Sequence, residues 1–183
     1  METKAVGLTE VQEIAATVVK EVVVNTFLMM AGMEATVGEV YTNDPSGNTR
    51  RSISGVIGWV GKYTGTGILD CSPEFACQLS NLMLGTEVAE LNEDALDAVA
   101  EMTNMVFGGM KTGLEEHCGA MGLSIPTVIY GNNVGMRSSG GKFIVVPVQI
   151  AEHELKVMMY FAKTEETRNS PAHFWASTSA GAL

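Results

Sequence analysis

Apolar residues recur at helical spacing over residues 8–31, and the pattern ends at Gly32, which predicts a first long helix. The stretch "DALDAVAEMTNMVFGGMK", residues 94–111, has the same amphipathic spacing and predicts a second long helix over about residues 92–117. Between them, "SPEFACQLSNLMLG" opens with a serine cap and a proline at the first helical position and closes on Gly85. These end signals predict a short helix.

Period-two alternation predicts strands in the remaining apolar segments. Residues 35–44 and 52–72 alternate, are rich in β-branched side chains and are punctuated by glycine, which predicts three antiparallel strands. The segments "LSIPTVIYG", "KFIVVPVQIAE" and "ELKVMMYFAK" predict three more, the last two joined by a tight turn at Glu152-His153. Pro126 and Pro147 cannot donate to a ladder, so we expect them at edges or bulges.

This order of elements predicts an α+β (α/β layered) fold, in which long helices cover a six-stranded, mainly antiparallel sheet. At 183 residues the chain is long enough for one domain with a buried core, which we assign to residues 1–164. Residues 165–183 lose all periodicity and are rich in Ser, Thr and Ala, so we interpret them as a tail. Phe174 and Trp175 are candidates to dock this tail on the domain or on a neighbour.

The charge balance argues against two classes of partner. The chain has 11 basic and 21 acidic residues, a net charge of −10, and no basic stripe. Nucleic acid is therefore not an expected partner, and an anionic membrane would repel the protein. The apolar stretch near the N-terminus is interrupted by Glu13, Lys20, Glu21 and Asn25 and has no cleavage-site pattern, so we expect no membrane insertion and a cytoplasmic location.

The cysteines and histidines do not suggest a metal site. Cys71, Cys77 and Cys118 are odd in number and lie in predicted core elements, which favours reduced, buried thiols. His117, His153 and His173 have no companions at ligand spacing, so no metal is expected in this chain.

The glycine-rich stretch "GWVGKYTGTG", residues 58–67, also invites a phosphate-loop interpretation. Its glycine and lysine are in the wrong order for such a loop, and no helix follows directly. A β-hairpin is therefore expected there.

The polar face of the second long helix carries the candidate chemistry. Asp97, Glu101 and Asn104 are spaced i, i+4 and i+7, which places them within an arc of about 60° on one side of the helix. Acids on such a face are most often simply solvated. Asn104, however, is a weak helix former in mid-helix. Gly108 and Gly109 each destabilise a helix interior by about 1 kcal/mol relative to alanine. Either a partner approaches this bare patch closely, or the glycines allow another element of the same domain to pack tightly.

The run Asp97-x-x-x-Glu101-x-x-Asn104, followed by "MVFGGMK" and "LSIPTVIYG", resembles the signature of the CheC/CheX family of bacterial chemotaxis phosphatases. In that family a (D/S)xxxExxN motif lies on an exposed helix and precedes a Pro-Thr-Val strand. CheC-like members carry a second ExxN on the first helix. Here that helix offers Glu21 and Asn25, which are four apart, so the resemblance is closest to single-site CheX-like proteins.

The resemblance implies hydrolysis of the aspartyl phosphate on a CheY-like receiver domain. Asn104 would orient the attacking water and Glu101 would dock on the receiver's lysine, and these two are the expected catalytic residues. The partner surface would also include Asp97, Met105, Gly108, Gly109 and Lys111.

No cofactor is expected in this chain, because the receiver would supply Mg²⁺. The alternative is a binding module that holds a receiver or another chemotaxis component without hydrolysis. A small-ligand sensor is a third possibility, for which the sequence has no signature. The family also includes dimers that pair or exchange edge strands, and the apolar strand "KFIVVPVQI" is a candidate for that role in a homodimer.

Overall fold

The computed structural model describes residues 7–43, 51–85, 87–132 and 141–164, so the expected tail at 165–183 lies outside the described residues. Three helices are present in this part of the chain: α1 (Leu8–Ala31), α2 (Pro73–Leu84) and α3 (Glu93–Cys118). They match the three expected helices to within a residue. Eight strands accompany them: β1 (Ala35–Val37), β2 (Tyr41–Asn43), β3 (Ser52–Val60), β4 (Tyr63–Cys71), β5 (Gly122–Leu123), β6 (Thr127–Gly131), β7 (Phe143–Ile150) and β8 (His153–Lys163).

The strands form one antiparallel sheet in the order β1-β7-β8-β4-β3-β5, with β2 also pairing with β7 and β6 also pairing with β3. The expected fold class is confirmed, with eight strands in place of six because two expected strands are each broken in two. The 35–44 segment breaks around Gly38, whose N–H donates to the Pro147 carbonyl at 2.9 Å. The 123–131 segment breaks around Pro126. The stretch at 58–67 forms the expected β3–β4 hairpin.

Pro147 lies in β7 where the partner strand is interrupted. Residues 148–150 pair with β1 and residues 143–145 pair with β2, so Pro147 faces the break between these two strands. In an antiparallel strand the N–H and C=O of one residue point to the same side. The Pro147 carbonyl points to the break, so the missing N–H would also have pointed there, and no strand residue loses a hydrogen-bond partner. The same pairing corrects one expectation: β7 is paired on both sides and is not a free edge strand for a dimer.

The β7–β8 turn lies one residue earlier than the sequence suggested. Its two turn residues are Ala151 and Glu152, and Ala151 has a positive φ of 50°. His153 already pairs with Ile150 in the ladder. An alanine with this backbone conformation is uncommon, so no turn preference in the sequence pointed to it.

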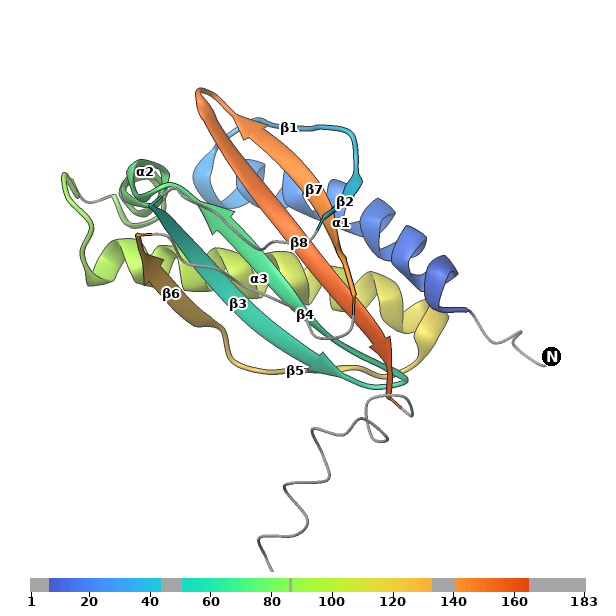
Figure 1. Ribbon diagram of the computed structural model, residues 1–183. Coiled ribbons are helices and arrows are strands. Elements are labelled where there is room, and N and C mark those ends of the chain that lie inside the picture. The colour runs from blue at the N-terminus through green and yellow to red at the C-terminus, as the bar shows by residue number, and fades with distance from the viewer. Residues whose placement is uncertain (1–6, 44–50, 86, 133–140, 165–183) are drawn as a thin grey trace, which may run out of the picture.

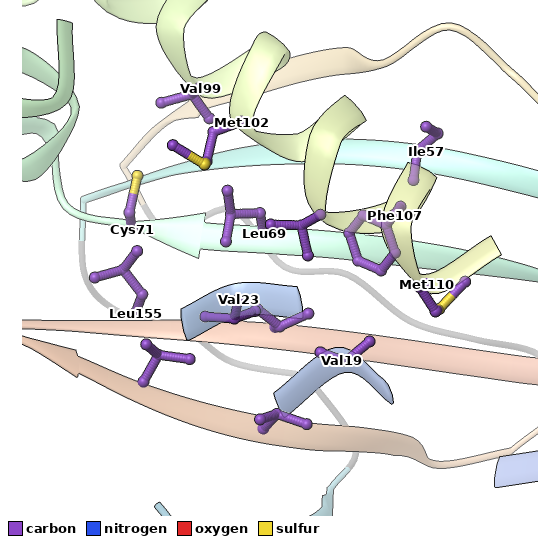
Figure 2. Close-up of a cluster of buried hydrophobic side chains, with 14 of the residues drawn as sticks. Val19, Val23, Ile57, Leu69, Cys71, Val99, Met102, Phe107, Met110 and Leu155 are labelled. Atoms are coloured by element: carbon purple, nitrogen blue, oxygen red, sulfur yellow. The ribbon is translucent and has the colours of Figure 1, made fainter. Parts of the chain in front are cut away.

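The helices and the sheet form two layers, with α1 and α3 side by side on one face of the sheet and α2 at its end (Figure 1). Figure 2 shows the core between these layers, where side chains of α1 and α3 meet side chains of β3, β4 and β8. Val19, Val23, Met102, Phe107 and Leu155 in this cluster are each fully buried. A smaller cluster, built on Ile68, Phe143, Val145 and Met158, alternates with the core positions and so lies on the opposite face of the sheet.

Helix α1 is long and apolar enough to cross a membrane by length and composition, with a mean hydropathy of 1.6 in its most apolar window. Its charged residues therefore do not exclude a span, contrary to the expectation from the sequence. Core helices of soluble proteins meet the same criterion. In this domain α1 buries one face, formed by Val11, Ala15, Val19, Val23 and Phe27.

All three cysteines are free thiols, as expected. Cys71 and Cys77 are buried, and burial raises the pKa of the Cys71 thiol well above its usual value. Cys118 is only half-buried at the end of α3, so the expectation of a buried thiol is not met there.

Candidate functional site

The candidate site lies on α3, whose two ends are fixed by local signals. The Asn92 side chain accepts a hydrogen bond from the Ala95 N–H at 3.0 Å and caps the first turn, where Glu93 and Asp94 complement the helix dipole. The helix ends at Gly119, which has a φ of 80° and donates its N–H to the Glu115 carbonyl. A 26-residue helix therefore spans the sheet with its polar face outward.

We call Asp97, Glu101 and Asn104 the polar ridge. All three side chains are exposed, and they share one face of α3 as the spacing predicted. Within the described residues, no hydrogen bond or ion pair engages any of them. The carboxylates and the amide are therefore available to another molecule.

The buried side of α3 sits unusually close to the sheet. A Cβ at Gly55 on β3 would overlap the Thr103 hydroxyl, and a Cβ at Gly67 on β4 would overlap the Phe107 ring. The Thr103 hydroxyl is satisfied within α3, because it donates to the Val99 carbonyl at 2.7 Å. These two sheet glycines fix the height and rotation of the helix and so direct the polar ridge away from the sheet. Sequence reasoning missed them, because a strand glycine gives no indication of what packs on it.

The two glycines of α3 have different roles. A Cβ at Gly108 would meet nothing within 4 Å, so the helix surface there is open, as the partner-approach hypothesis requires. A Cβ at Gly109 would lie 2.6 Å from Cγ1 of Val22 on α1. Gly109 therefore belongs to the contact between α1 and α3, and we withdraw it from the expected partner surface. The tight-packing alternative is correct for this residue.

Gly113 repeats the Gly109 contact one turn later. A Cβ there would lie 2.7 Å from Cγ1 of Val18, so the "GMKTG" stretch forms a small-residue seam against α1. This G-x-x-x-G spacing was visible in the sequence, and it would have indicated a close helix contact. The seam sets the distance between α1 and the polar ridge.

The remaining expected partner residues lie beside the ridge. Met105 is half-buried, between the ridge and α1. Lys111 forms an ion pair with Glu115 at 2.8 Å, and the Met121 N–H also donates to Glu115 at 2.9 Å. These two interactions hold the pKa of the Glu115 carboxyl below its usual value. Lys111 is thus already engaged with the end of its own helix.

A polar hollow of about 600 Å³ lies elsewhere, where β4 ends and α2 begins. On its floor Asp70 is buried, and it accepts a hydrogen bond from the Ser54 hydroxyl at 2.6 Å. Burial raises the pKa of Asp70, although hydrogen bonds from Ser54 and Ser52 and the nearby Lys156 act in the opposite direction. The hollow shares no residue with the polar ridge.

In the part of the chain that the structure describes, no group of three or more His, Cys, Asp or Glu side chains could hold a metal ion. The chemistry available at the ridge itself is therefore hydrogen bonding by an amide beside a carboxylate. Such a pair can orient a water and bind a cation, and it carries no strong nucleophile.

A model of the family described as "Chemotaxis phosphatase CheX" matches residues 53–149, which is more than half of the chain and includes the whole polar ridge. This chain belongs to the CheX family. The expectation drawn from the Asp97, Glu101 and Asn104 motif is confirmed at the level of the family. The match does not test the role of any one of these residues.

A curated CheX relative and a solved CheX structure agree with this assignment. The "CheY-P phosphatase CheX" of Thermotoga maritima is 31% identical over 104 residues, which cover 56% of this chain and 66% of that protein. The matched segment thus spans just under two thirds of the relative. The crystal structure of CheX from Vibrio vulnificus is 26% identical, with a TM-score of 0.72 over 81% of this chain and 99% of that one.

CheX from Borrelia burgdorferi is 19% identical, with a TM-score of 0.67, and the match covers 86% of this chain and 99% of that one. At this identity the likeness shows a shared fold.

Proposed function

We propose that this protein is a phosphatase that hydrolyses the aspartyl phosphate of a CheY-like receiver domain. The observation that carries the proposal is the polar ridge. It presents a carboxylate and an amide, exposed and unengaged among the described residues, inside the segment that matches the CheX family.

The names of the relatives support this choice of substrate. The Thermotoga maritima relative is a CheY-P phosphatase, and the Borrelia burgdorferi protein of the same fold was crystallised as a complex with CheY, BeF₃ and Mg²⁺. In our proposal the Mg²⁺ belongs to the receiver. The metal and a receiver lysine neutralise the phosphoryl oxygens, so this chain needs to add only an oriented nucleophile.

Asn104 is the residue that we propose orients the attacking water. Its amide can accept one hydrogen bond from the water and donate another without taking up a proton. The water oxygen attacks phosphorus in line with the bond to the receiver's aspartate. That P–O bond breaks, the aspartate leaves as a free carboxylate, and both protons of the water leave with the inorganic phosphate as H₂PO₄⁻. The rate gain comes from positioning.

Glu101 lies one turn before Asn104 on the same ridge. Side chains at this spacing are about 5–6 Å apart on a helix surface, so Glu101 can pair with the receiver's lysine while the amide reaches the phosphoryl group. We assign Asp97, a further turn away, a contact with the rim of the receiver's pocket. Gly108 continues the same face and leaves space for receiver backbone.

A timed phosphate-release assay tests the proposal. The receivers of the source organism are phosphorylated with a small-molecule phosphodonor, and phosphate loss is followed with and without this protein. We expect catalytic acceleration by the wild type, a large loss in Asn104→Ala, and no phosphorylated form of this protein at any time. Receiver binding without acceleration would instead establish the binding-module alternative.

A homodimer and a cytoplasmic location are also part of the proposal. The family resemblance implies self-association through sheet edges, and β7, the strand that the sequence suggests for this role, is not a free edge. A light-scattering mass equal to one chain would contradict the dimer. Fractionation of the source cells, with this protein recovered in the membrane pellet, would contradict the location.

A further inference from the structure

The contact between α1 and α3 defines the relative direction of the two helices. Gly109 faces Val22, and Gly113, one turn later on α3, faces Val18, one turn earlier on α1. The helices therefore run antiparallel, as Figure 1 also shows. Positions can then be matched along the two helices by their common rise of about 1.5 Å per residue.

Met29 continues the face of α1 that packs on α3. Val18, Val22 and Met29 are spaced i, i+4 and i+11, so the three side chains point in nearly the same direction. Val18 and Val22 are partly buried by the α3 glycines. Met29 is 76% exposed. The side chain thus occupies a packing position of the helix but has no cover among the residues that the structure describes.

Helix spacing places Met29 at the same level as Glu101, on the neighbouring helix. Met29 is seven residues beyond Val22, which is about 10 Å along α1. Val22 faces Gly109, and seven residues before Gly109 on the antiparallel α3 is the turn that carries Glu101. Met105 is half-buried on the α1 side of the ridge, between Met29 and Asn104 in angular position around α3. Both methionines are therefore on the α1 side of Glu101 and Asn104.

We infer that Met29, together with Met105, is an apolar docking contact for the receiver domain whose phosphate the ridge reaches. This inference rests on the proposed function. The occupant is assigned by continuity. A receiver that admits the Glu101 and Asn104 side chains must cover the surface around them, and the exposed Met29 lies at the same level on the neighbouring helix. A large apolar side chain beside polar contacts excludes water from them, and the flexible methionine side chain adapts to a partner's shape.

The neighbouring Leu28 supplies a matched control. It is also exposed, at 51%, but lies about 100° away around α1, on a different side of the same turn. We expect Met29→Ser to raise KM for the phosphorylated receiver about 10-fold with kcat within about twofold of the wild type, since the contact aids docking and not water orientation. Leu28→Ser should leave both constants unchanged, and Met29→Leu should retain the wild-type KM.

Several outcomes would overturn this inference. Equal KM values for the wild type and Met29→Ser would do so while leaving the proposed function intact, provided that Asn104→Ala still loses hydrolysis. An effect of Leu28→Ser as large as that of Met29→Ser would show a general loss of fold. If Met29→Ser alters the mass measured by light scattering but not KM, the contact belongs to a second copy of this chain.

If the wild type binds receivers without hydrolysis, the same variants are compared by Kd. If it neither hydrolyses nor binds, both proposals fail.

Discussion

Gly109 and Val22 meet at a close approach between α1 and α3, where a Cβ on the glycine would lie 2.6 Å from Cγ1 of the valine. This contact sets the spacing of the two helices whose neighbouring surfaces carry Asn104 and Met29. A glycine that looked functional in the sequence is therefore structural, and it acts on the site through the position of a helix.

We expect Gly109→Ala to lower the free energy of unfolding by about 1 kcal/mol. Overpacking costs about 1–3 kcal/mol, and the gain in helix propensity offsets about 1 kcal/mol of this. The valine facing the added methyl is stiff and cannot readily turn away. In a Val22→Ala background the overpacking should vanish, so a double-mutant cycle by urea denaturation should give a favourable coupling. Equal costs in both backgrounds would contradict the contact.

Gly108→Ala should behave in the opposite way. A Cβ there meets nothing within 4 Å, so the substitution adds helix propensity without a clash and should raise the free energy of unfolding by about 0.5–1 kcal/mol. If the receiver approaches this patch closely, the same variant should have a higher KM for the phosphorylated receiver. A stabilised variant with unchanged kinetics would remove Gly108 from the partner surface.

Asn104→Ala should retain receiver binding and lose most dephosphorylation. Because the amide is expected to act by orientation, we expect a fall in kcat of about 100-fold or more, with KM little changed. Single-turnover phosphate release at saturating protein measures this directly. Asn104 is exposed, so we expect the variant to fold normally, and its circular dichroism spectrum is the control. Wild-type kcat in a folded variant would refute the orienting role.

Glu101→Ala should weaken both binding and turnover, because its carboxylate is expected to pair with the receiver's lysine. Titration of a receiver that carries a phosphoryl analogue should give a higher Kd for the variant than for the wild type. The difference in Kd should become smaller at high salt, because salt also screens this attraction in the wild type. Asp97→Ala, at the edge of the ridge, should have the smaller effect. A larger effect at Asp97 than at Glu101 would reverse the two assignments.

Asp70→Asn should stabilise the domain at neutral pH. Burial raises the pKa of Asp70, so between the unfolded value of about 3.9 and the higher folded value the native state holds more protons than the unfolded state. Stability from this group is therefore present below the unfolded pKa and is lost as pH rises through the folded pKa. The asparagine can still accept from Ser54. Thermal melts of both proteins should diverge as pH rises from 3 to 7, and parallel curves would contradict a raised pKa.

The sequence by itself determined the three helices, the antiparallel character of the sheet and the polar ridge. Caps such as Ser72 and Asn92 act within one turn, and the i, i+4 and i+7 spacing of the ridge fixes its shared face wherever the helix lies. Local spacing also carried the resemblance that led to the CheX family.

Only the tertiary structure decided what surrounds the polar ridge. The opposite surroundings of Gly108 and Gly109, the pairing of β7 on both sides and the alignment of Met29 with the level of Glu101 all depend on segments distant in sequence. Periodicity shows which way a side chain points but not what lies opposite it, because that neighbour is chosen by the packing of the whole chain.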